Sequence, residues 1–265
     1  MNARILRSLI FVATTLGVAC LDMSAPKGPS SISLLQLPSP SVVIGDVMRD
    51  SNGVPAPLGV IAFDANGTPI GGVTSQVYIT DSSHVAHLDA NHNLTGDRLG
   101  VVHLIGQIGS LQTAVAAVPV TSVPYTFAKT TTTDTLAAPF PTDSASSIKS
   151  DTFKVSLKGI GDSASQGFIV RYVLDSAPPS LPSSKGPGVY LASSNGKPSL
   201  VDTTNAAGIA SHVLVVNSLA LADSALLGGT KVDSAVVRAF TSYKGALVAG
   251  APLRFVIYIK VTFGK

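Results

Sequence analysis

The sequence LRFVIYIKV at residues 253–261 decides the fold class. Leu253, Phe255, Ile257, Ile259 and Val261 share one parity, opposite Arg254, Tyr258 and Lys260. A period of two places alternate side chains on opposite faces of a strand and predicts a half-buried strand of an antiparallel sheet. The same period recurs at residues 153–157 and 168–174. These stretches predict an all-β fold.

Composition supports the same fold class. The chain has no Glu and no Trp, and only 12% of its residues are charged. Val, Ala, Ser, Thr, Gly and Pro dominate where a helical protein would carry Glu, Lys and Leu. A mainly helical fold is therefore excluded. A length of 265 residues suits two sandwich modules, each able to bury its own core.

The charge balance limits the classes of partner. The net charge of +3 includes Arg4 and Arg7 near the N-terminus, so without them 16 basic residues face 15 acidic ones, a net charge of +1. This balance predicts no basic surface for nucleic acid or anionic lipid. Beyond the leader, no apolar run reaches the roughly 18 residues that span a bilayer.

Residues 1–19 are predicted to be a secretion signal, with a basic start, a short apolar centre and a small-residue exit. They end at Leu16-Gly17-Val18-Ala19-Cys20, which resembles the lipobox of bacterial lipoproteins and contains the only cysteine. The resemblance implies that a lipid is joined to the Cys20 sulfur and that cleavage makes Cys20 the first mature residue. Gly17 departs from the Leu that is usual there. The alternative is an ordinary secreted protein in which Cys20 is discarded or idle.

Residues 20–30 are rich in Pro, Gly and Ser and are predicted to be a flexible, lipidated tether. Two or three acyl chains would make a stable anchor, because one chain alone binds membranes only marginally. By analogy with Gram-negative sorting, Leu21 after the lipidated residue favours the outer membrane.

Residues 31–123 are predicted to form the first sandwich, since short apolar runs alternate with turns such as Asn52-Gly53. Its motifs are IGD (44–46), DANG (64–67), VYITDSS (77–83), VAHLD (85–89), NLTG (93–96) and GVVHLI (100–105). In this order they resemble bacterial Ig-like domains of group 2, which are related to invasin and intimin. Tyr78 stands where that family has Trp, and Asn93 where it has Gly. The resemblance implies an Ig-like sandwich with a structural or adhesive role and no catalytic residues.

Residues 124–265 are predicted to form a second Ig-like sandwich, with 124–150 partly linker because that segment is rich in Thr, Ser and Pro. The stretch 202–215 resembles the turn and strand of group 1 bacterial Ig-like domains, and residues 232–241 with Gly250-Ala251-Pro252 resemble their closing strands.

Two patterns suggest metal ligands, and we interpret both as structural. His84, His87, His92 and His103 fall within twenty residues, but strand geometry separates them, since an odd spacing sends His84 and His87 to opposite faces. The sequence DANHN at 89–93 begins like a calcium loop, yet Leu94 and Gly100 replace the required Gly and Glu. A polar hairpin turn is the expected structure. We therefore predict no metal and no cofactor.

Catalysis finds little support in the sequence. Gly161-Asp162-Ser163 is similar to a nucleophile turn, but Asp-Ser pairs recur along the chain and His212 is the only histidine of that module. We therefore predict a non-enzymatic envelope lipoprotein with a structural, adhesive or protein-interaction role. Two alternatives stay open. One is a module that binds carbohydrate or an envelope protein through a sheet edge or loops such as 176–188, and the other is a hydrolase with a nonstandard site.

Overall fold

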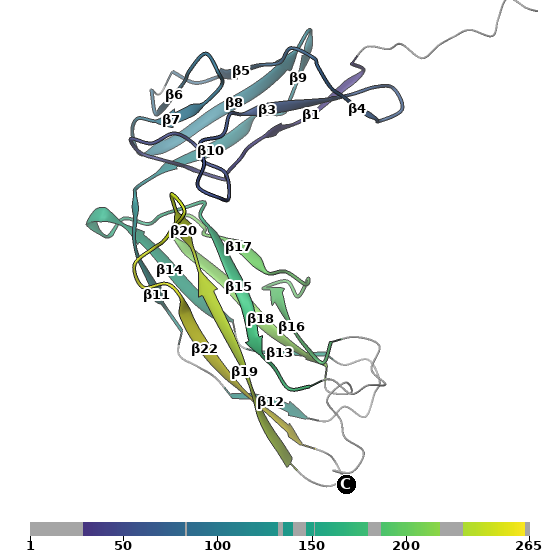
Figure 1. Cartoon of the computed structure of the whole chain (residues 1–265), viewed down its shortest axis with the longest axis vertical. Helices are drawn as coiled ribbons and strands as arrows, with labels where there is room; N and C mark the ends of the chain where they lie inside the picture. The colour runs from purple at the N-terminus through teal and green to yellow at the C-terminus, as the bar shows by residue number, and fades with distance from the viewer. Residues whose placement is uncertain are drawn as a thin grey trace, which may run out of the picture.

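The computed structural model describes residues 29–82, 84–131, 135–139, 147–150, 152–179, 187–217 and 230–262, and Figure 1 shows their arrangement. These residues form β-strands and one 3₁₀ turn, Ile160–Asp162. Within these ranges the chain forms no helix long and apolar enough to cross a bilayer. The all-β prediction is confirmed. The predicted signal peptide, Cys20 and most of the tether lie outside the described residues.

The first set of strands encloses one core (Figure 1). One sheet has the order β1-β3-β4, another has the order β2-β10-β8-β5 with β9 paired to β8, and β6 and β7 form a hairpin. Val102, Leu104 and Val118 are fully buried between them. The strands are β1 (Ser31–Gln36), β2 (Val42–Val43), β3 (Gly59–Phe63), β4 (Pro69–Ile70), β5 (Gln76–Ile79), β6 (Ala86–Leu88), β7 (Leu94–Gly96), β8 (Gly100–Ile108), β9 (Leu111–Gln112) and β10 (Ala116–Thr121).

The second set of strands forms two facing sheets around a larger core. One has the order β11-β14-β18-β13 with β16 also on β18, the other β12-β22-β19-β15-β17, and β20 and β21 form a separate hairpin. The strands are β11 (Pro124–Lys129), β12 (Thr135–Pro139), β13 (Ser147–Lys149), β14 (Phe153–Gly159), β15 (Ile169–Ser176), β16 (Val189–Ser193), β17 (Val201–Thr203), β18 (Ile209–Asn217), β19 (Thr230–Phe240), β20 (Ser242–Tyr243), β21 (Ala246–Leu247) and β22 (Leu253–Thr262).

The strand order of the second set is that of an immunoglobulin sandwich. The path β11-β14-β18-β16 corresponds to strands A, B, E and D, and the path β22-β19-β15 corresponds to G, F and C. In the first set, β10-β8-β5 makes the same G-F-C sheet, whereas the opposite layer is broken into short pieces. The segment 124–150, expected to be partly linker, contains β11, β12 and β13 in its described parts.

Two edge strands depart from the expected antiparallel pairing. β2 runs parallel to β10, and β12 runs parallel to β22. In each module an early strand lies beside the last one, so the two run in the same direction at the sheet edge. The period of two holds in β22, since Phe255, Ile257 and Ile259 are at most 3% exposed while Tyr258 is 50% exposed.

Candidate functional site: the junction between the modules

Two of the four histidines pair with aspartates, and His84, expected on a strand with His87, lies before β6 with a positive φ of 50°. His87 Nδ1 lies 2.8 Å from Asp97, and His103 Nδ1 lies 3.0 Å from Asp81. Both pairs are exposed on the surface of the first module. Among the described residues, no group of three His, Cys, Asp or Glu side chains lies close enough to hold a metal ion.

The calcium-like loop is a hairpin turn between β6 and β7, as predicted. Asp89 Oδ1 accepts the backbone N–H groups of Asn91 and Asn93 at 2.8 and 2.9 Å. These hydrogen bonds, together with that of the Asn93 side chain, lower the pKa of the Asp89 carboxyl. The carboxylate is therefore occupied in holding the turn.

Ser163 and His212 do not form a nucleophile–base pair. The Ser163 hydroxyl donates to Ser122 Oγ at 2.7 Å. His212 is fully buried, its ring stacks on Tyr172 with centroids 4.1 Å apart, and its Nε2 lies 2.9 Å from the carbonyl oxygen of Ser199. Each side chain contacts neighbours that fix it in the sandwich. The loop at 176–188, expected as a contact loop, lies largely outside the described residues.

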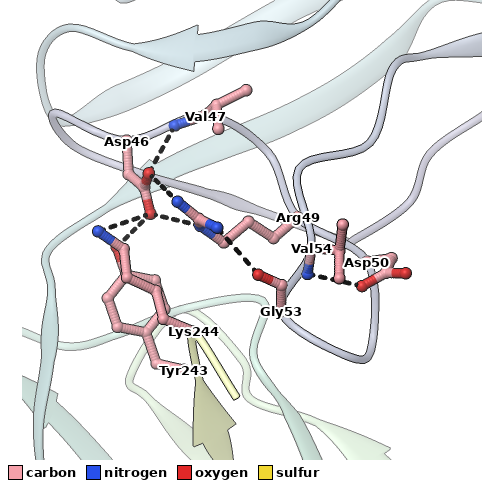
Figure 2. A network of polar contacts seen from close by, with 8 residues as sticks. All are labelled: Asp46, Val47, Arg49, Asp50, Gly53, Val54, Tyr243 and Lys244. Carbon is pink, nitrogen blue, oxygen red and sulfur yellow. Dashed lines mark hydrogen bonds and ion pairs between the residues drawn. The ribbon is translucent and has the colours of Figure 1, made fainter. Parts of the chain in front are cut away.

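The densest polar network joins the two modules (Figure 2). Asp46 lies on the loop after β2, and Tyr243 and Lys244 lie on the β20–β21 hairpin, where Lys244 and Gly245 form the two-residue turn. Both turn residues have positive φ, 52° and 75°, as the commonest two-residue hairpin turn requires. This turn directs the hairpin tip toward the first module.

Asp46 is the centre of this network, which we call the Asp46 junction, made by Asp46, Arg49, Tyr243 and Lys244. The carboxylate is 8% exposed. Arg49 donates to both of its oxygens at 2.9 Å, and the backbone N–H of Val47 donates to Oδ1 at 3.0 Å. From the other module, the Tyr243 hydroxyl donates to Oδ2 at 2.5 Å, and Lys244 Nζ lies 3.4 Å from the same oxygen.

The electrostatics of the junction favour a permanently ionised Asp46. Burial raises the pKa of its carboxyl, but the hydrogen bonds from Arg49 and Tyr243 and the charge of Arg49 outweigh burial, so the pKa lies well below its usual range. Burial and the Asp46 carboxylate raise the pKa of the Tyr243 hydroxyl far above its usual value. Tyr243 therefore remains a donor, and the network keeps its charges at physiological pH.

Apolar and backbone contacts reinforce the polar ones. Val43 of β2 belongs to the core cluster of the second module, and the Phe168 ring packs edge-on against Tyr243 at a centroid distance of 6.4 Å. The backbone N–H of Gln166 donates to Thr121 Oγ1 at 3.2 Å. A hollow of about 70 Å³ remains at the junction, which corresponds to a few water molecules. Polar, backbone and apolar contacts thus all join the two modules here.

In the sequence, Asp46 is part of the IGD motif, but no role could be assigned to it. Neither Tyr243 nor Lys244 belongs to a recognised motif. The spacing of Asp46 and Arg49 by three residues is the one local signal of an ion pair. Tyr243 lies 197 positions after Asp46. A contact at that separation depends on how the two modules dock, which no local pattern encodes.

No protein-family model and no curated protein matches the sequence. Solved structures that resemble the chain include domains 4 and 5 of the S-layer protein SbsC, with 15% identity, a TM-score of 0.31, and coverage of 87% of this chain and 99% of that one. The Yersinia pseudotuberculosis adhesin InvE has 17% identity, a TM-score of 0.27, and coverage of 84% and 57%. The Escherichia coli adhesin FdeC has 14% identity, a TM-score of 0.29, and coverage of 85% and 66%. These likenesses are too distant to assign the chain to a family or to a function.

Proposed function

We propose that this chain is a non-enzymatic cell-envelope lipoprotein whose two Ig-like modules form one rigid arm with a structural or adhesive role. The observation that carries the proposal is the Asp46 junction. There a buried carboxylate of the first module accepts hydrogen bonds from side chains of both modules. Tandem modules move relative to one another by default. Because the Asp46 junction fixes the two modules to each other, they act as a spacer that holds its far end at a fixed distance and orientation from the anchor.

The strength of the Asp46 junction follows from its chemistry. Hydrogen bonds to a charged group contribute about 1.5–3 kcal/mol each, because the charge strengthens the bond. The Tyr243 bond crosses between the modules, so separating them would leave the Asp46 carboxylate with fewer donors in a site from which most water is excluded. Bidentate pairing with Arg49 fixes the orientation of the carboxylate in advance.

The anchor rests on the sequence alone. A signal that ends at the single cysteine, followed by a tether at 20–30, supports attachment of the arm to the outer membrane through Cys20. Binding of carbohydrate or of another protein is compatible with a rigid arm, because such binding concerns the surface of the arm and not its rigidity.

Distance measurements between spin labels test the rigid arm. The Cys20→Ser chain has no other cysteine, so labels at Ala114→Cys and Ser194→Cys, both exposed positions, report one distance between the modules. We expect a narrow distribution that broadens in Asp46→Ala. Asp64→Ala is the control, because it removes an aspartate that accepts backbone N–H groups in a loop away from the junction. A broad distribution before any junction substitution would refute the rigid arm.

A further inference from the structure

The outer face of the sheet β12-β22-β19-β15-β17 carries an unusual set of side chains. Val170 and Tyr172 of β15 are buried, so Arg171 and Val173 between and after them face outward. Parity places Arg238 of β19 and Arg254 of β22 on the same outer face. We call this surface the arginine face and define it by Arg171, Val173, Val236, Arg238, Arg254, Val256 and Tyr258.

The strand register brings the arginines together. Arg238 is directly opposite Arg254 on one side and Val173 on the other, and Arg171 lies two residues before Val173. Opposed cross-strand residues have Cβ atoms about 4.5–5.5 Å apart, and diagonal neighbours are about 7–8 Å apart. Three guanidinium groups therefore occupy adjacent strands in one corner of the sheet. Like charges directly opposite each other destabilise a sheet, so folding alone does not favour this arrangement.

The face has an excess of positive charge. Arg238 donates to Asp175 Oδ2 at 2.5 Å, and this hydrogen bond raises the pKa of Arg238. Arg171 and Arg254 are exposed and make no ion pair or hydrogen bond through their side chains to any described residue. Asp202 and Asp233 have inward parity, opposite Val170 and Ile259. The three arginines and Asp175 together carry a net charge of +2.

The apolar part of the face indicates which class of acidic partner fits. Val173 is 37% exposed and Tyr258 is 50% exposed, while Val236 and Val256 are half-buried beside the Arg238–Arg254 pair. Sugar hydroxyls laid on these valines would lose hydrogen bonds to water without replacement, which is costly. Apolar side chains of a protein would instead gain from burial. Protein interfaces are enriched in Arg and Tyr and combine an apolar centre with a polar rim.

We infer that the arginine face docks the acidic surface of another envelope protein, one that presents carboxylates beside an apolar area. Each exposed charge pair contributes at most about 1 kcal/mol, so the arginines orient the partner and speed the encounter, while burial of the valines and of Tyr258 supplies affinity. The inference rests on the proposed adhesive or structural role and names the partner class for it.

Photo-crosslinking in cells of the source organism, with the full chain, tests this inference. A photoreactive amino acid at Val173, beside Arg238, should form an adduct whose crosslinked peptide in the partner is acidic. The same label at Thr126, exposed on the opposite sheet, is the positional control. We expect the double charge reversal Arg171→Glu with Arg254→Glu to reduce the adduct at least tenfold. Arg171→Lys with Arg254→Lys should keep most of it, because the charge is retained.

Lys154→Glu is the matched control for charge reversal, since Lys154 is exposed on the other sheet and should leave the adduct unchanged. An unchanged thermal unfolding midpoint shows that a variant is folded. A crosslink to lipid, polysaccharide or a second copy of the chain, no adduct at all, or an adduct that survives the double reversal would overturn the inference. The spin-label distances report the junction and do not require a bound partner, so a rigid arm without an acidic partner would defeat the inference and leave the proposed function standing.

Discussion

The loops at Asp50 and Asp64 form a matched pair that tests the junction between the modules. In each loop the aspartate Oδ1 accepts backbone N–H groups two and four residues later, at 2.8 or 2.9 Å. Each loop also has a glycine in the left-handed region, Gly53 with φ 82° and Gly67 with φ 77°. Only the surroundings differ. A Cβ on Gly67 would meet nothing within 4 Å, whereas one on Gly53 would lie 2.4 Å from the backbone nitrogen of Gly245 in the other module.

Gly53→Ala should therefore destabilise the protein more than Gly67→Ala. The left-handed conformation costs alanine about 1–2 kcal/mol at either site, and this cost cancels in the comparison. Gly53→Ala must also displace the β20–β21 hairpin, because backbone cannot move aside as a flexible side chain can. The Tyr243 hydrogen bond to Asp46 sets the scale of the extra loss at about 2 kcal/mol.

Urea unfolding followed by far-UV circular dichroism measures both variants, and the spin-label distance reports whether the modules have separated. We expect Gly53→Ala to lower the free energy of unfolding further and to broaden the distance distribution, while Gly67→Ala leaves the distribution narrow. If the two variants lose the same free energy of unfolding to within about 0.5 kcal/mol, the scatter expected for independent sites, the reasoning that Gly53 is needed for docking is refuted.

Three further predictions address the pH response, the buried histidine and the anchor. The pKa of Asp46 is lower in the folded state than in the unfolded state, so its contribution to stability is present at neutral pH. The difference in unfolding free energy between the chain and Asp46→Asn should shrink as pH falls from about 5 to about 2, because the unfolded state binds the proton first; a constant difference would contradict this. His212→Ala should cost about 2–4 kcal/mol in urea unfolding, because it removes a buried ring and leaves the Ser199 carbonyl without a partner, whereas the exposed His87→Ala should cost about 0.5 kcal/mol or less. Metabolic labelling with a fatty-acid probe should mark the chain and not Cys20→Ser, and equal labelling of both would exclude lipidation of Cys20.

The fold class was predictable because its signal is local. The alternation at residues 253–261 and the turn residues between short apolar runs depend only on neighbours along the chain. The parallel edge pairs β2–β10 and β12–β22 were not predictable in this way. A two-residue strand such as β2 carries no period, and its direction depends on which distant strand is free at the sheet edge.

The hairpin expected at Asp89 is present, because local spacing determines it. His84 and His87 were expected on opposite faces of a strand and His103 on a separate strand, because that argument uses spacing along the chain. The role of Asp46 could not be predicted from the sequence, because it depends on how the two modules dock and no period or motif contains that information. His212 likewise looked like an isolated polar residue, and only the stack on Tyr172 shows why it lies in the core.

The net charge of a whole chain does not reveal how charge is distributed over its surfaces, as the arginine face shows. A net charge of +1 after the leader predicts no basic footprint, and this holds for the chain as a sum. Strand parity, however, sorts charges by face, and the register of β15, β19 and β22 then aligns Arg171, Arg238 and Arg254 on one side. Asp50, Asp64 and Asp89 lie in turns, where backbone N–H groups donate hydrogen bonds to their carboxylates. These hydrogen bonds satisfy the three carboxylates, and a chain that is nearly neutral overall can still present a positive face to a partner.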